Sequence, residues 1–148
     1  APVGVYLDAG INVALGTDSA ASNNRLDLFA EMRLASLLAK VTQGDAAALP
    51  AATVLRMATL GGARAVGLDD RIGSLVPGKD ADVVAVDFSS VALAPCYDPV
   101  SHLVHAAGRE HVTDVWIEGE RLVDSGRLVR LDSAAITARA ALWRDRIA

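Results

Sequence analysis

Asp18 is the residue whose type and position most directly suggest chemistry. It lies just after residues 11–15, a short apolar segment that is partly β-branched. Such a segment predicts a buried strand, which places Asp18 at the strand's C-terminal end. A carboxylate there is costly unless it is paired or bound to a cation, and the C-terminal strand ends of α/β barrels face the active site. Two interpretations remain open: a divalent-metal ligand that exchanges a proton with the attacking water, or a cap for the turn at Ser19 and Ala20.

The three histidines and the single cysteine give a weaker signal. His102 and His105 are three residues apart, so they can share one face of a helix. A zinc site needs three or four ligands, and neither His111 nor Cys96 is placed to complete one. Cys96 also has no basic neighbour, so a reactive thiolate is not indicated. We expect the histidines to lie on the surface or at an interface.

Two further patterns resemble reactive sites, but the residues around them do not support that function. Residues 73–79 match the spacing of a phosphate-binding loop, but Asp80 stands where Ser or Thr would hold magnesium. Pro77 removes an amide that the phosphates need, and a predicted strand follows instead of a helix. We interpret this segment as a tight turn between strands. Ser19 and Ser22 have no evident partner base, which argues against a serine nucleophile.

The elements that would position these residues can be outlined from apolar periodicity and from capping signals. The first half is mainly helical around one strand, and the second half contains short strands and a terminal helix. Apart from the strand at 11–15, the predicted elements are a helix ending at Gly10, helices at 25–43, 50–60 and 63–68, a strand at 81–86, a helix at 100–107, a hairpin of 112–117 with 121–123, and a last helix to about Ile147. The expected boundaries are an Asn24/Asp27 capping box, a stop at Gly44, a break at Gly61 and Gly62, and an N-cap at Ser133.

The composition restricts the class of protein. The chain has 148 residues, 52% of them hydrophobic, and a formal net charge of −4. This is a globular composition that fits one domain or pieces of two. The negative net charge does not favour binding to nucleic acid or to an anionic membrane. No run of apolar residues is long enough to span a membrane. Because the sequence begins at Ala1 without an initiator Met, we expect a fragment whose N-terminal part lies elsewhere.

Four motifs carry a family resemblance. They are GTDSAASNN at 16–24 continuing as LDLFAEMR at 26–33, ATLGGARA at 58–65, IGSLVPGKDADVV at 72–84 and VWIEG at 115–119. Together they resemble the metal-dependent amidohydrolase superfamily, closest to its 5-methylthioadenosine/S-adenosylhomocysteine deaminase and chlorohydrolase-type branch. The later motifs identify the superfamily, and the Ser-Asn-Asn loop favours the adenosine-type branch.

The resemblance implies a fold and a site. The implied fold is α/β. Residues 1–70 would be the C-terminal part of a (β/α)8 TIM barrel, in which 11–15 is strand eight. Residues 71–132 would belong to a small β-sandwich domain, and residues 133–148 would form a terminal helix. Asp18 is the last ligand of one divalent ion, with zinc expected, and accepts the proton of the attacking water. Asp18, Ser22 and Asn23 contact the substrate. The family's remaining ligands are histidines of earlier strands, which this chain lacks.

The implied reaction is the hydrolytic deamination of an adenosine-type nucleoside by the complete enzyme. The alternatives are guanine or cytosine deamination, triazine dechlorination, or a non-catalytic packing or binding role if the chain is complete. The expected partner is a small nucleoside-type substrate, with neither nucleic acid nor membrane, in a cytoplasmic homo-oligomer. The fragment alone is expected to be inactive and either poorly soluble or oligomeric, because one carboxylate cannot hold zinc and one barrel strand leaves apolar surface exposed.

Overall fold

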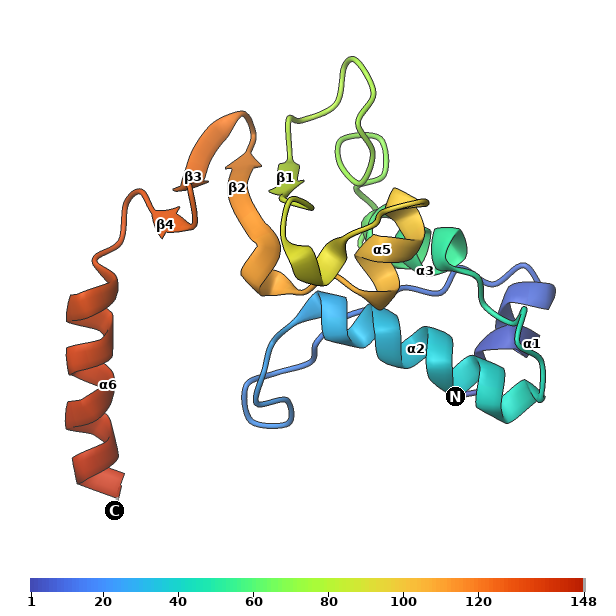
Figure 1. Ribbon diagram of the computed structural model, residues 1–148, viewed down its shortest axis with the longest axis horizontal. Coiled ribbons are helices and arrows are strands. Elements are labelled where there is room, and N and C mark those ends of the chain that lie inside the picture. Colours follow the sequence, from blue (N-terminus) through green and yellow to red (C-terminus); the bar gives the residue numbers. More distant parts are fainter. Residues whose placement is uncertain (148) are drawn as a thin grey trace.

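The computed structural model describes residues 1–147 and contains a helical body, a small sheet and a terminal helix (Figure 1). The body contains α1 (Val3–Asp8), α2 (Leu28–Gln43), α3 (Ala51–Ala58), α4 (Leu60–Ala65) and α5 (Pro99–His105). The sheet contains β1 (Val83–Val86), β2 (Val112–Ile117), β3 (Glu120–Asp124) and β4 (Arg127–Leu128). Short 3-10 turns span Val91–Leu93 and Arg109–His111, and the last element is α6 (Ser133–Ile147). The predicted mixture of helices and strands is confirmed.

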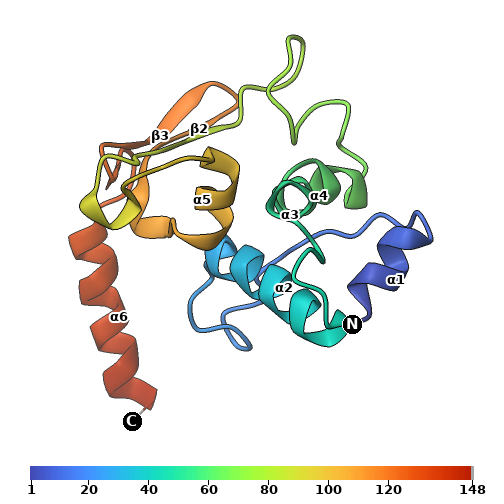
Figure 2. The same cartoon turned by 45° about the vertical axis from the view of Figure 1, so that its right-hand side comes forward.

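The core lies where α2, α3 and α5 meet (Figures 1 and 2). Val54 of α3 and Val104 of α5 are completely buried, and Met32 of α2 and Met57 of α3 pack around them. These apolar side chains hold α5, which lies between β1 and β2 in the sequence, against the first half of the chain. The helical body and the sheet are therefore joined through α5.

The N-cap of helix α2 is Asp27 and not the predicted Asn24, and the helix begins at Leu28. The Asp27 carboxylate accepts hydrogen bonds from the amides of Phe29 and Ala30, and it is almost fully buried. Leu26 has a left-handed φ of 46°, so the chain turns sharply just before the helix. That turn excludes a helix beginning at residue 25, and the predicted capping box is wrong. The predicted stop is confirmed, since Gly44 caps the helix at φ 64°.

The break between the next two helices also differs from the prediction. It falls at Thr59, whose backbone leaves the helical region, while Gly61 and Gly62 lie inside α4. A Cβ at Gly61 would approach the carbonyl oxygen of Val13 to 2.9 Å. The glycine at 61 therefore permits close packing of α4 on the segment around Val13 instead of ending a helix.

The four strands form one antiparallel sheet in the order β1-β2-β3-β4. The predicted hairpin is confirmed: β2 and β3 are joined through Glu118 and Gly119, both with positive φ, as a tight hairpin turn requires. The predicted strand at 81–86 begins at Val83. The two-residue strand β4 was not predicted, because a pair this short has no detectable period.

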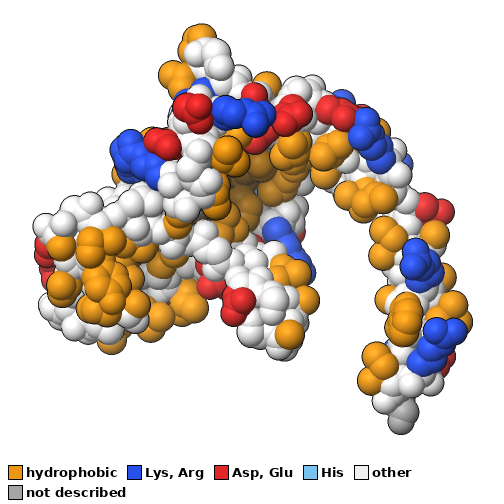
Figure 3. Space-filling view, turned by 180° about the vertical axis from the view of Figure 1, so that it is seen from behind, with side chains coloured by type: hydrophobic (Ala, Val, Ile, Leu, Met, Phe, Trp, Pro, Cys, Tyr) orange, Lys and Arg blue, Asp and Glu red, His pale blue; other side chains and the backbone are white. Residues whose placement is uncertain are grey.

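Helix α6 extends away from the rest of the molecule (Figures 1 and 3). Its residues are all exposed up to Ile147, including the large apolar side chain of Trp143. The predicted N-cap Ser133 is wrong: the carboxylate of Asp132 accepts from the amides of Ala134 and Ala135. No helix within residues 1–147 has the length and apolar character needed to cross a membrane.

Residues 11–15 do not form the predicted buried strand. The segment has no regular secondary structure, and Ile11 is 52% exposed. Its backbone hydrogen bond to α3 runs from the amide of Leu15 to the carbonyl of Met57. A strand requires a ladder with a neighbouring strand, and residues 1–147 provide no such neighbour for this segment. The apolar pattern predicts a strand but not the missing partner.

Candidate active site

Asp18 lies in an exposed turn, held in a left-handed conformation with φ 59°. Its Oδ1 accepts a hydrogen bond from the amide of Ser19 at 2.8 Å, and its Oδ2 accepts one from the hydroxyl of Ser22 at 2.7 Å. The structure therefore brings Asp18 and Ser22 together. It also shows the capping contact to Ser19 that the alternative interpretation predicted, so the carboxylate caps the turn and remains accessible.

The hydrogen bonds keep the Asp18 carboxylate ionised. The hydrogen bond from the Ser22 hydroxyl lowers the pKa of Asp18 below its ordinary value, and the hydrogen bond from the Ser19 amide lowers it by a smaller amount. Both donors stabilise the charged form of the carboxylate. An ionised, exposed carboxylate is a competent ligand for a divalent cation and a competent acceptor for a proton. The local geometry fits either role.

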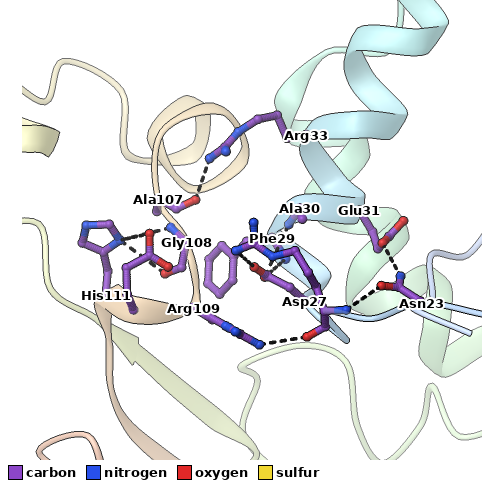
Figure 4. Close-up of polar contacts among 12 residues, drawn as sticks. Asn23, Asp27, Phe29, Ala30, Glu31, Arg33, Ala107, Gly108, Arg109 and His111 are labelled. Carbon is purple, nitrogen blue, oxygen red and sulfur yellow. Dashed lines mark hydrogen bonds and ion pairs between the residues drawn. The ribbon is translucent and has the colours of Figure 1, made fainter. Parts of the chain in front are cut away.

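The Asn23 side chain is hydrogen-bonded to partners other than Asp18. Its Nδ2 donates to Oε1 of Glu31 on α2 at 2.7 Å, and its Oδ1 accepts from the amide of Arg25 at 3.0 Å (Figure 4). Both ends of the Asn23 amide are thus engaged within the loop. The Asn23 side chain makes no hydrogen bond to Asp18 among the described residues. Glu31 lies in the same quoted motif, but the sequence analysis assigned it no role.

A complete metal site would need more than Asp18. Within residues 1–147, no three side chains of His, Cys, Asp or Glu come together as a metal-binding group. His102 contacts Phe88, His111 accepts from the amide of Gly108, and neither has a contact with the Asp18 turn. Asp18 therefore belongs to no such group within the described residues.

Two other features lie apart from Asp18. An open hollow of about 230 Å³ is lined by Leu7, residues 10–13, and parts of α3 and α4, at the other end of the 11–15 segment. The segment at 73–79 lies between α4 and β1, so the prediction of a turn between two strands is wrong. Its Lys79 Nζ donates hydrogen bonds to the carbonyls of Asp69 and Ile72. Neither feature shares a residue with the Asp18 turn.

Comparison with known proteins finds similar sequences along nearly the whole of this chain. The curated 5-methylthioadenosine/S-adenosylhomocysteine deaminase of Teredinibacter turnerae is 49% identical over 146 residues, which cover 99% of this chain and 33% of the relative. The chain thus spans about a third of the length of the curated relatives it matches.

Solved structures show the same fold. An adenosine deaminase from Xanthomonas campestris with bound zinc matches with a TM-score of 0.96 and 52% identity, over 99% of this chain and 33% of that one. The atrazine chlorohydrolase from Arthrobacter aurescens complexed with zinc matches with a TM-score of 0.89 and 33% identity, over 96% of this chain and 32% of its own. Residues 1–122 match the amidohydrolase family, and the chain belongs to that family.

Proposed function

We propose that the intact protein containing this chain hydrolytically deaminates adenosine-type nucleosides such as 5-methylthioadenosine and S-adenosylhomocysteine. The observation that carries the proposal is the 49% identity to a deaminase of that name across nearly the whole chain. The adenosine deaminase structure at 52% identity supports the same substrate class, whereas the triazine chlorohydrolase is only 33% identical. Identity therefore favours the nucleoside deaminases over the dechlorinating enzymes.

The proposed architecture follows the same relatives. Residues 1–70 would form the last part of a (β/α)8 barrel, residues 71–132 part of a small β-domain, and 133–148 a terminal helix. In the intact barrel, residues 11–15 would gain the neighbouring strands that they lack here. The close match to two structures that each extend well beyond this chain supports the proposal.

Asp18 has two proposed roles: it binds a divalent ion and accepts the proton of the attacking water. The relatives with bound zinc support zinc as the ion. When bound, such an ion lowers the pKa of water to about 7 and so makes a nucleophile available at neutral pH. Ser22 keeps the carboxylate ionised and oriented through its 2.7 Å hydrogen bond. The accepted proton would then be returned to the leaving amino group, which departs as ammonia.

The test is the substitution Asp18→Asn in the intact protein. The amide keeps the shape of the carboxylate but loses its charge and basicity, so deamination should fall by at least about 100-fold. Bound zinc, measured by elemental analysis, should fall as well.

Asp87→Asn is the matched control. Asp87 caps Ser89 through a backbone amide and a hydroxyl, both at 2.8 Å, and these bonds likewise lower its pKa. Like Asp18, Asp87 accepts hydrogen bonds from one backbone amide and one serine hydroxyl, but it has no proposed role in the chemistry, so the control should retain activity. Undiminished turnover in Asp18→Asn would refute the role. A substrate panel that adds a triazine separates the two chemistries.

A further inference from the structure

The loop between Asp18 and α2 is held in a conformation that a free chain would rarely adopt. It begins at Asp18 with φ 59° and ends at Leu26 with φ 46°. Leu26 is not a residue that favours left-handed backbone, and its side chain is half exposed, so packing alone does not fix it. Conformations of this kind persist only where surrounding contacts impose them.

One arginine contacts this loop directly, and a second arginine, on α2, contacts the segment from which the first one extends. Arg109, just before β2, donates from Nη1 to the carbonyl oxygen of Arg25 at 2.8 Å. Arg33, on α2, donates from Nη2 to the carbonyl oxygen of Ala107 at 2.8 Å. Figure 4 shows the Arg33 guanidinium joining α2 to Ala107, and the Arg109 guanidinium joining the segment before β2 to the loop that precedes α2. We call Arg33 and Arg109 the arginine clamp.

The clamp acts on the peptide that sets the left-handed turn. The carbonyl of Arg25 belongs to the peptide unit joining Arg25 to Leu26, and the orientation of that unit is coupled to φ of Leu26. The hydrogen bond from Arg109 therefore favours the orientation in which Leu26 is left-handed. Without it, the Arg25–Leu26 peptide is free to rotate toward a more favourable conformation.

Hydrogen bonds continue from this peptide to Asp18. The amide of Arg25 donates to Asn23 Oδ1, and the amides of Asn23 and Ser22 donate to the carbonyl of Ser19. The amide of Ser19 and the hydroxyl of Ser22 then hold the Asp18 carboxylate. A displacement at Arg25 is thus transmitted through a continuous set of bonds.

The other end of the clamp is anchored in the sheet. His111 accepts from the amide of Gly108 through Nδ1, and its carbonyl accepts from the amide of Asp87, directly after β1. Ala107 is completely buried. Arg109 therefore extends from a fixed segment, and its contact joins residues 84 positions apart in the sequence.

We propose that Arg109 is a positioning residue that fixes the loop of residues 19–26 and, through it, the direction of the Asp18 carboxylate. Its effect on turnover rests on the proposed function, whereas its effect on the loop does not. Because misplacing a catalytic group by about 1 Å can cost up to about 100-fold in rate, the clamp has a direct kinetic consequence.

The first test measures the loop itself in the intact, zinc-loaded protein. Amide hydrogen exchange, followed by mass spectrometry, is compared for Arg109→Ala and for Arg127→Ala. Arg127 lies on β4 and has no side-chain hydrogen bond or ion pair within residues 1–147, so it controls for loss of charge. Exchange in residues 19–26 should rise about tenfold in Arg109→Ala only, with α3 unchanged. Equal exchange in both variants overturns the proposal.

The second test asks whether the peptide orientation is the cause. Adding Leu26→Asn to Arg109→Ala should restore slow exchange, because Asn adopts left-handed backbone more readily than Leu.

In deamination assays, Arg109→Ala should lower kcat about tenfold with KM changed less than twofold, and Arg109→Lys should recover part of the loss. If Arg109→Ala does not fold, Arg109→Gln replaces it. Slower kcat without faster loop exchange, or no rescue by Leu26→Asn, contradicts the mechanism. Faster exchange in a protein that deaminates no nucleoside would refute the proposed function and leave the clamp intact.

Discussion

At the scale of single residues, Asp27 connects the candidate site to the core. Only 3% of the residue is exposed, and its carboxylate holds the first turn of α2 while pairing with Arg25 at 3.2 Å. A buried carboxylate is tolerated when hydrogen bonds and an ion pair compensate it, and Asp27 has both. Its neighbour Leu26 is the left-handed residue at the end of the site loop. Asp27 thus fixes where the loop stops and the helix begins.

We predict that Asp27→Ala lowers the free energy of unfolding by about 1–2 kcal/mol, because the amides of Phe29 and Ala30 lose their acceptor. Asn24→Ala should change it by less than about 0.5 kcal/mol, since Asn24 is exposed and does not cap the helix. Urea denaturation of the intact protein measures both. If the two substitutions lowered the free energy of unfolding equally, the assignment of Asp27 as the helix cap would be contradicted.

The sequence was sufficient to single out Asp18 but not the orientation of its neighbours. Asp18 follows an apolar segment and carries a family motif, and both signals are local. Asn23 shares that motif, yet its direction is set by Glu31, and the loop's last peptide is held by Arg109. These contacts depend on how α2 and the sheet pack, which no short spacing encodes. The proposed substrate contacts of Ser22 and Asn23 remain predictions.

At the scale of elements, α4 packs on the segment that leads to Asp18. A Cβ at Gly61 would lie 2.9 Å from the carbonyl of Val13 and 3.1 Å from that of Arg56, and backbone atoms cannot move away cheaply. At Gly62 the nearest such atom is 4.0 Å away. Two adjacent glycines in one helix therefore serve different purposes.

We predict that Gly61→Ala destabilises the protein by about 1–3 kcal/mol through overpacking. Gly62→Ala should instead be neutral or stabilising by up to about 1 kcal/mol, because alanine favours a helix and fits the space. Chemical denaturation midpoints of the two variants decide the matter. A tolerated alanine at 61 would mean that α4 does not press on the Val13 segment.

The packing of α5 on α2 carries a pH dependence. Burial lowers the pKa of His105, and the positive charges of Lys40 and Arg33 lower it further. The unfolded chain therefore binds a proton at higher pH than the folded one, so stability is lost as the pH falls below about 6.5 toward the folded pKa. Because His105 is only partly buried, the effect is small.

We predict that lowering the pH from 7.5 to 5.0 reduces Tm more in wild type than in His105→Gln. The comparison cancels the contribution of every other titrating group. His102→Gln, on the same helix, serves as the control and should follow wild type. Thermal melts in matched buffers measure the three slopes, and parallel slopes for wild type and His105→Gln would contradict the prediction.

Element existence was more predictable than element boundaries. The period of apolar residues is visible along α2, α3 and the β2–β3 hairpin, so these were expected. The start of α2 and the break at Thr59 depend on backbone conformations at single residues, which that period does not report. The strand expected at 11–15 depends on neighbours that residues 1–147 do not contain.

At the scale of the whole molecule, apolar side chains remain on the surface. Leu34, Leu37, Leu38 and Val41 are each about half exposed or more, and their spacing forms one stripe along α2. Figure 3 shows hydrophobic side chains gathered on one face of the helical body and along α6. Large apolar patches of this kind mark surfaces that normally contact other protein. The relatives extend over about three times the length of this chain, which provides a source for that contact.

We predict that the stripe has opposite effects in the isolated chain and in the intact protein. Expressed alone, residues 1–148 should self-associate, and Leu37→Gln with Leu38→Gln should reduce the association with little change in folding, because both side chains are already exposed. In the intact protein the same pair should destabilise by about 1.5–3 kcal/mol per leucine if the remainder covers the stripe. Light scattering after size exclusion and urea denaturation provide the two readouts. A monodisperse monomer of the isolated chain, or an intact protein whose stability is unchanged by both substitutions, would contradict the prediction that the rest of the protein covers the stripe.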